Sequence, residues 1–359
     1  MTVGAVNVAW LLALGSALFF LFVALAALHY RHWVRRLSVE MEYVLTERIT
    51  TPDGAVIELR RLPFGVTVGP PILCVHGIGI DHRNNDAVPA ASLARFLAAA
   101  GRDVWLLTLR TGIEHPTAAQ RRSMRFDSMA RHDLPLAIDA IRLRTSAPAI
   151  DYVGFSMGGM LLYAALGATI PEEAIRRVVI LGSPGRLLVP SRIVSFLARA
   201  PRRFVPRLPL RVPSRMVAFA ADAFHTPIHF IVLNPRNVER GIAPSMLMSI
   251  RDIPGELMAD FAAFLADGGT VRFEGEDVLR RIRTHRTPAL FFAGGADRLA
   301  PIAAVSQAYE AWGSDASPVS KRLVRLDIES LGTDYGHGDL AIGRAAREHI
   351  FEPTLVFLT

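Results

Sequence analysis

A serine flanked by glycines carries the strongest chemical signal in this sequence. Residues 154–159 read Gly-Phe-Ser-Met-Gly-Gly, directly after an apolar segment at 150–153 and directly before an apolar helical pattern at 157–168. A strand, a sharp turn and a helix in this order form the context in which a Gly-x-Ser-x-Gly motif presents its serine hydroxyl at the edge of a sheet. Glycine is needed on either side of the serine because a side chain would collide across so tight a turn. We therefore predict that Ser156 is a nucleophile.

A serine nucleophile needs a base, and the base needs an acid that orients it. Asp297 closes the segment Phe-Phe-Ala-Gly-Gly-Ala-Asp at 291–297, in which an expected strand runs into a glycine turn. His337 lies in Asp-Tyr-Gly-His-Gly-Asp at 334–339, a loop after the last expected strand. The chain order of serine, acid and histidine predicts that Asp297 orients His337 and that His337 is the base for Ser156.

Other side chains compete for the acid and base roles. His349 also follows Asp297, but it falls within the closing helical stretch rather than in a loop. Three carboxylates lie so close to His337 in sequence that they do not come from a separate strand end: Asp327, Asp334 and Asp339.

Two backbone amides are expected to stabilise the negative charge that develops on the substrate oxygen. One belongs to Met157, the residue after the nucleophile, and the other to Ile78, in the flexible His-Gly-Ile-Gly segment at 76–79. We expect the His76 side chain to brace this loop rather than to take part in catalysis. Three residues of the same loop region are placed at the entrance of the site: Asp81, His82 and Asn85.

Alternating strand and helix patterns must position these residues. An opening hairpin is expected from two strands at 43–49 and 55–62, joined by Thr-Pro-Asp-Gly. Further apolar strands are expected at 72–76, 104–108, 150–153, 178–181, 290–293 and 323–328, with helices at 92–100, 133–144, 157–168 and 302–312. Such a pattern predicts an α/β fold with a mostly parallel sheet that helices cover on both faces.

The alternation breaks once, in a stretch of about a hundred residues that is rich in proline and arginine. We predict an inserted cap or lid at 185–285, within a catalytic domain made of 43–184 and 286–359. Ten arginines and no acidic residue lie between positions 176 and 215. Two interpretations stay open for this basic stretch: a solvated face, or a face that lies on anionic lipid.

The N-terminal residues form an apolar segment without charge from position 3 to position 28. As a helix these residues extend about 39 Å, more than the roughly 30 Å hydrocarbon core of a bilayer. Arg31, Arg35 and Arg36 follow, whereas no basic residue precedes the segment, so the positive-inside rule places the rest of the chain in the cytoplasm. We predict a single-pass membrane anchor at 1–30 and a linker at 31–42; a cleaved signal peptide is the alternative.

Composition and motifs exclude several classes of protein. The single cysteine, Cys74, rules out a disulfide scaffold and a cysteine-based zinc site. The net charge of +7 comes with no nucleic-acid-binding motif, and no phosphate-binding, dinucleotide or histidine metal motif is found, so no cofactor, metal or nucleic acid is expected.

The quoted motifs resemble those of the α/β-hydrolase superfamily, and within it those of the acid lipases and the polyhydroxyalkanoate synthases. Besides the Ser156 motif, the resemblance rests on segments 92–106, 133–139 and 335–340, and it covers roughly 40–185 and 286–359. It implies the same roles for Ser156, Asp297 and His337. The synthases use cysteine where this chain has Ser156, which favours hydrolysis over polymerisation.

We therefore predict a membrane-anchored serine hydrolase that cleaves carboxylic esters of apolar acyl chains. Membrane lipid is the expected partner of the N-terminal helix and, under the second interpretation of the basic stretch, also of the arginine-rich cap. Two alternatives stay open. An acyltransferase would use the same acyl-enzyme, and a non-catalytic, membrane-tethered scaffold would use only the fold.

Overall fold

A computed structural model describes residues 3–63, 65, 67–188, 207–225 and 229–359, and places an eight-stranded sheet at their centre. The strands follow in the order β1-β2-β4-β3-β5-β6-β11-β12 across this sheet. β2 pairs antiparallel with β1, as the expected hairpin requires, and also antiparallel with β4, whereas the other pairs of this sheet are parallel. Their bounds are β1 Leu45–Thr50, β2 Val56–Arg61, β3 Ile72–Val75, β4 Val104–Thr108, β5 Ile150–Phe155, β6 Ile175–Leu181, β11 Ala289–Gly294 and β12 Lys321–Leu326.

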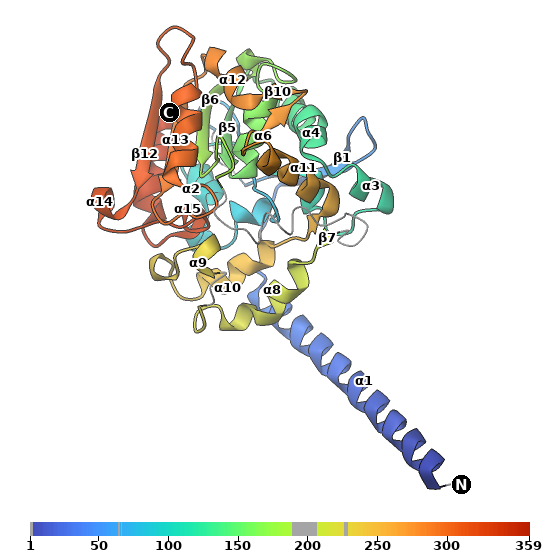
Figure 1. Cartoon of the computed structure of the whole chain (residues 1–359). Helices are drawn as coiled ribbons and strands as arrows, with labels where there is room; N and C mark the ends of the chain where they lie inside the picture. The colour runs from blue at the N-terminus through green and yellow to red at the C-terminus, as the bar shows by residue number, and fades with distance from the viewer. Residues whose placement is uncertain (1–2, 64, 66, 189–206, 226–228) are drawn as a thin grey trace.

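Helices cover both faces of this sheet (Figure 1). Successive side chains of β5 and β11 point to opposite faces, so Tyr152 and Phe291 pack in one apolar cluster and Val153 and Phe292 in the other. The helices of this part are α2 Leu93–Ala99, α3 Ala118–Arg122, α4 Phe126–Ser128, α5 Leu134–Thr145, α6 Met157–Ala165, α13 Ile302–Ala311, α14 Ile328–Leu331, α15 Asp339–Ile342 and α16 Glu352–Leu358.

The long insertion joins two strands that pair directly. The chain leaves the sheet after β6 and returns in β11, which lies beside β6 in parallel. Residues 189–206 of the arginine-rich stretch fall outside the described residues. The described elements between the two strands are β7 Arg207–Leu208, α8 Arg211–Val217, α9 His229–Val232, α10 Ile242–Met246, β8 Ile253–Pro254, α11 Gly255–Ala266, β9 Arg272–Phe273, β10 Glu276–Asp277 and α12 Val278–Arg281.

The first helix, α1 (Val3–Leu37), projects from the body of the protein as a straight rod (Figure 1). Within its segment Val8–Leu37, an 18-residue window has a mean hydropathy of 2.6 and is not buried, so by length and composition the helix is able to cross a membrane. A signal sequence near the N-terminus has the same two properties. Where α1 meets the body, it lies beside α8 (Figure 1).

Candidate active site

Ser156 occupies a tight turn between β5 and α6. Its backbone has φ 51° and ψ −118°. This conformation is unfavourable for any residue that has a side chain, so the packing around the turn must maintain it. The turn leaves no room for a side chain at Gly158, where a Cβ atom would lie 2.5 Å from the Val75 carbonyl oxygen. Because Ser156 N–H donates to the Leu181 carbonyl at 2.9 Å, β6 holds the turn from the other side.

Asp297 and His337 form a buried pair at the same edge of the sheet. His337 Nδ1 lies 2.7 Å from Asp297 Oδ2, and the two residues are 7% and 3% exposed. Asp297 Oδ1 accepts hydrogen bonds from the backbone N–H groups of Leu299 and Ala300, at 2.9 and 2.7 Å. With the carboxylate held on both oxygens, Nδ1 donates to Asp297, and the Nε2 atom of the ring is left to accept a proton.

The end of β6 joins the serine turn to this pair. Gly182 N–H donates to the Phe292 carbonyl at 3.0 Å, and Gly182 has φ 58°. A Cβ atom at Gly182 would lie 3.3 Å from both Asp297 Oδ2 and His337 Cε1. The rings of His337 and of Phe155, the residue before the serine, are 5.0 Å apart. The structure therefore brings Asp297 and His337 together and places this pair beside the turn of Ser156, while no hydrogen bond joins Ser156 to His337 among the described residues.

The loop after β3 lies against the serine turn. A Cβ atom at Gly77 would be 2.9 Å from Ser156 Cβ, so the loop approaches the nucleophile closely. Among the described residues, neither the Ile78 nor the Met157 backbone N–H donates a hydrogen bond, which leaves both amides free for a substrate oxygen.

His76 braces this loop. Its Nδ1 lies 2.8 Å from the Gly77 carbonyl, and its Nε2 accepts the Leu109 N–H at 3.1 Å, so the ring is the neutral tautomer with the proton on Nδ1. Burial lowers the pKa of His76 to about 4, which keeps the ring uncharged near neutral pH.

Two of the three competing carboxylates accept hydrogen bonds from other groups, and the third, Asp334, has a buried Oδ1 atom with no partner among the described residues. Asp327 caps α14 by accepting the Ser330 N–H at 2.9 Å, and Asp339 accepts the Gly336 and Asn234 N–H groups at 2.9 and 2.8 Å. Burial raises the pKa of Asp339 to about 6. In the part of the chain that the structure describes, Asp297 is the carboxylate that hydrogen-bonds to His337.

The entrance residues expected from the sequence are largely buried. Asp81 is fully buried and is ion-paired with Arg83 and Arg251, each at 2.6 Å. His82 hydrogen-bonds to the Thr108 hydroxyl at 2.9 Å, and Asn85 is buried. These side chains stabilise the loop that carries Ile78, and Asp81 and His82 also line a separate pocket of about 290 Å³.

The sequence analysis missed Gly182 and assigned Gly77 only to a flexible loop. Both glycines lie where an added Cβ atom would come within 3.3 Å of Ser156, Asp297 or His337, and they belong to loops that are far apart in sequence. The available signal was a glycine directly after each of two expected strands, at the carboxyl edge where the site had to form.

Comparison with known proteins bears on the fold. A family model described as the alpha/beta hydrolase fold matches residues 70–327, well over half of the chain. This chain belongs to the α/β-hydrolase family. The predicted α/β-hydrolase fold, with its mostly parallel sheet, is thereby confirmed.

Two curated α/β-hydrolase relatives are lipases. Human gastric triacylglycerol lipase is 32% identical over 142 residues, which are 36% of this chain and 35% of that protein. Mouse lipase member M is 33% identical over 140 residues, 35% and 33% of the two chains. The chain thus spans about a third of the length of the relatives it matches. The expected similarity to acid lipases is confirmed as a distant one, and the similarity to polyhydroxyalkanoate synthases stays a prediction.

Solved structures share the fold at low identity. An esterase from Exiguobacterium antarcticum superposes with a TM-score of 0.57 at 15% identity, covering 88% of this chain and 99% of its own. An esterase from Thermogutta terrifontis gives 0.56 at 18% identity, covering 88% and 98%. This similarity extends the shared fold over most of the chain.

Proposed function

We propose that this α/β-hydrolase is a serine hydrolase that cleaves carboxylic esters of apolar acyl chains. The observation that carries the proposal is the buried pair of His337 and Asp297, 2.7 Å apart, beside the strained turn of Ser156. The names of the relatives, a triacylglycerol lipase among the curated proteins and esterases among the structures, support an ester substrate.

Each group has a defined part in this reaction. The Ser156 hydroxyl oxygen attacks the ester carbonyl carbon while His337 Nε2 takes the hydroxyl proton, and Asp297 stabilises the imidazolium that forms. The amides of Ile78 and Met157 donate to the carbonyl oxygen as it becomes negative. His337 then gives its proton to the leaving alcohol. Water, activated by the same ring, releases the acid from Ser156 and restores the enzyme.

Labelling with a fluorophosphonate probe tests the nucleophile. We expect the membrane-bound protein to be labelled and the Ser156→Ala variant to lose both the label and ester hydrolysis. Ser146→Ala is the matched control, because Ser146 also has a positive φ, 54°, but is exposed at the end of α5. A folded wild-type protein without label would favour the scaffold alternative. Product analysis with an added alcohol would separate hydrolysis from acyl transfer.

The anchor is the second part of the proposal. We infer that α1 holds the enzyme in the cell membrane with its catalytic domain in the cytoplasm, because Arg31, Arg35 and Arg36 flank only the C-terminal side of the apolar segment. Protease treatment of sealed cells should then leave the C-terminus protected. Digestion of the C-terminus from outside would contradict this orientation.

Contacts between α1 and the cap support a cap that lies on the membrane surface. The Trp33 ring stacks on Phe219 at 5.1 Å, His29 Nε2 lies 2.9 Å from the Met216 carbonyl, and Arg215 Nη1 donates to the Tyr30 hydroxyl at 3.3 Å. The last turns of a spanning helix lie at headgroup level, so the residues that touch them lie there too. Nearby apolar side chains of the cap are exposed, among them Val217 at 55% and Phe224 at 70%.

Cysteine-attached fluorophores test this contact in the full-length chain. The native Cys74 is buried, and burial raises its pKa to about 12, so it should resist thiol reagents. In proteoliposomes with anionic lipid, we expect a polarity-sensitive dye on Val217→Cys or Phe224→Cys to report an apolar environment. Val356→Cys is the control, since Val356 is 77% exposed and lies near the C-terminus, away from α1 (Figure 1). An aqueous signal at all three positions would contradict the contact.

A further inference from the structure

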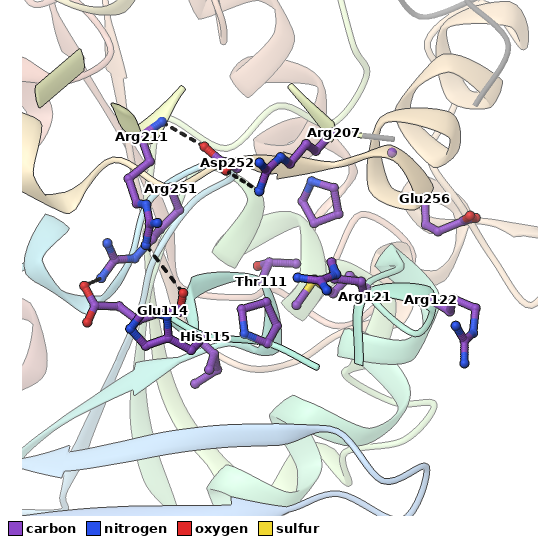
Figure 2. Close-up of a pocket in the computed structure, with 15 residues that line it drawn as sticks. Thr111, Glu114, His115, Arg121, Arg122, Arg207, Arg211, Arg251, Asp252 and Glu256 are labelled. Carbon is purple, nitrogen blue, oxygen red and sulfur yellow. Dashed lines mark hydrogen bonds and ion pairs between the residues drawn. The ribbon is translucent and has the colours of Figure 1, made fainter. Parts of the chain in front are cut away.

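A pocket of about 520 Å³ opens between the loop after β4 and the cap (Figure 2). One wall comes from residues 111–124, and the other from β7, the start of α8 and residues 251–256. Five arginines line it, against three carboxylates: Arg121, Arg122, Arg207, Arg211 and Arg251, with Glu114, Asp252 and Glu256.

The carboxylates already have cationic partners. Glu114 pairs with Arg251 at 3.1 Å, Asp252 pairs with Arg207 at 3.4 Å, and Glu256 pairs with Arg125, which lies outside the pocket lining, at 3.8 Å. Asp252 also accepts the backbone N–H of the Arg211 residue at 2.9 Å (Figure 2).

Three guanidinium groups of the pocket have no carboxylate partner among the described residues. Arg121, Arg122 and Arg211 have no ion pair within the described residues, and Arg211 reaches only the Glu114 carbonyl, at 3.5 Å. The pocket therefore holds a surplus of positive charge that is not neutralised by the described part of the protein.

The inner end of the pocket adds a buried cation. Arg251 is 5% exposed, and its Nη1 atom is buried without a hydrogen-bond partner in the described part of the chain. Burial lowers the pKa of Arg251, and neighbouring Arg83 and Arg215 lower it further, against the opposite effect of Asp81 and Glu114. A bound anion would offset this crowding of positive charge.

A helix N-terminus opens on the same pocket. Gly255, the first residue of the twelve-residue helix α11, is part of the lining, and the residue before it, Pro254, makes no side-chain cap. The free N–H groups of a first helical turn and the positive end of the helix dipole both favour an anion.

Arg251 connects the pocket to the catalytic loop. Its backbone N–H donates to the Gly79 carbonyl at 2.8 Å, and its Nε donates to the Gly112 carbonyl at 3.1 Å. Gly79 follows Ile78, whose amide is one of the proposed donors to the substrate oxygen. Arg251, a residue of the pocket lining, is therefore hydrogen-bonded to the loop that would hold the ester carbonyl, at the position next to Ile78.

We propose that this pocket binds a phosphate group on the alcohol side of the ester, so that the substrate is an apolar acyl ester of a phosphorylated alcohol. The inference rests on the proposed hydrolase function and names its substrate class. Several arginines match a phosphate better than a single carboxylate, because its oxygens accept hydrogen bonds from more than one guanidinium fork.

The test compares two esters with the same acyl chain, one of glycerol 3-phosphate and one of glycerol, with the full-length enzyme in neutral detergent. We expect wild type to have the higher kcat/KM on the phosphate-bearing ester. In the Arg121→Gln/Arg122→Gln variant we expect the ratio of the two kcat/KM values to fall at least tenfold. Arg322→Gln is the matched control, because Arg322 is an exposed arginine on β12, at the opposite edge of the sheet, and should leave the ratio intact.

Inhibition by inorganic phosphate distinguishes a pocket that binds a phosphate group of the substrate from a pocket that binds a free phosphate ion. The proposal is supported if phosphate competitively inhibits hydrolysis of the phosphate-bearing ester and does not inhibit hydrolysis of the neutral ester. A change by phosphate in kcat on the neutral ester, lost in the double variant, would assign the pocket to free phosphate and overturn the substrate assignment. An unchanged ratio in the double variant would overturn the site itself.

Binding without catalysis keeps this inference separate from the proposed function. The Ser156→Ala protein should bind an ether analogue of the phosphate-bearing ester in calorimetry, and adding Arg121→Gln/Arg122→Gln should weaken that binding at least tenfold. Equal binding with and without the two arginines would refute the pocket. Failure of wild type to hydrolyse either ester would refute the proposed function while this binding result still stands.

Discussion

The sheet edge that holds the candidate site and the inserted cap differ in whether their side chains find partners within the protein. At the sheet edge, Asp297 is 3% exposed and makes hydrogen bonds to the His337 ring and to two backbone amides. In the cap, Phe224 is 70% exposed, and Arg211 has no ion pair within the described residues. The polar atoms of the Asp297–His337 pair thus find their partners within the protein, whereas the outer cap exposes apolar and cationic groups that have no such partners among the described residues.

This difference predicts that the largest loss of activity comes from the buried pair. Asp297→Asn removes the charge that stabilises the His337 imidazolium and allows the wrong ring tautomer, so we expect kcat to fall by about 10⁴-fold. Hydrolysis of a soluble short-chain ester measures this effect. Asp334→Asn, a change in the histidine loop itself, is the control and should lose less than tenfold. Equal losses in the two variants would refute the assignment of Asp297.

The second prediction concerns the brace of the catalytic loop. His76 has a pKa of about 4 in the folded protein, below the ordinary value of 6.5, so the unfolded chain binds a proton that the folded protein does not. The stabilisation from neutral His76 is complete above pH 6.5 and is lost as pH falls towards 4, by about 3 kcal/mol at most.

Chemical unfolding in detergent between pH 7.5 and 4 measures this dependence, and His76→Asn should flatten it. His285, whose pKa burial also lowers to about 4, should keep part of the slope in that variant. An identical slope in the variant and wild type would show that His76 does not carry the effect.

The smallest expected effect lies where the cap meets α1. Phe219→Ala removes the stack on Trp33, and such aromatic pairs contribute about 0.5–1.5 kcal/mol. We expect hydrolysis of an ester embedded in vesicles to fall two- to fivefold relative to a soluble ester. In a double-mutant cycle, Trp33→Ala/Phe219→Ala should lose little more than either single variant. Additive losses would mean that the two rings do not act together.

Part of the candidate site could be predicted because each of its residues lies in a short segment with a recognisable local pattern. The strand, turn and helix around Ser156 depend on residues 150–168, and the loops of Asp297 and His337 each follow a recognisable strand. Parallel strands end at one edge, so the three side chains had to be near one another once the sheet was predicted. The sequence could not identify Gly182 as a position where a side chain would crowd both Asp297 and His337, because that crowding depends on how three strands pack side by side.

The α/β class, the opening hairpin, the long insertion and the apolar N-terminal helix could all be predicted from the sequence alone, because hydrophobic periodicity and turn residues are local properties. Only the tertiary structure decided that Trp33 meets Phe219, that Asp81 is buried by Arg83 and Arg251, and that the arginines of α3 face those of the cap. These partners come from segments far apart in the chain. The hydrophobic effect that packs such segments together is non-directional, so the local pattern of a segment does not identify which distant residues it will contact.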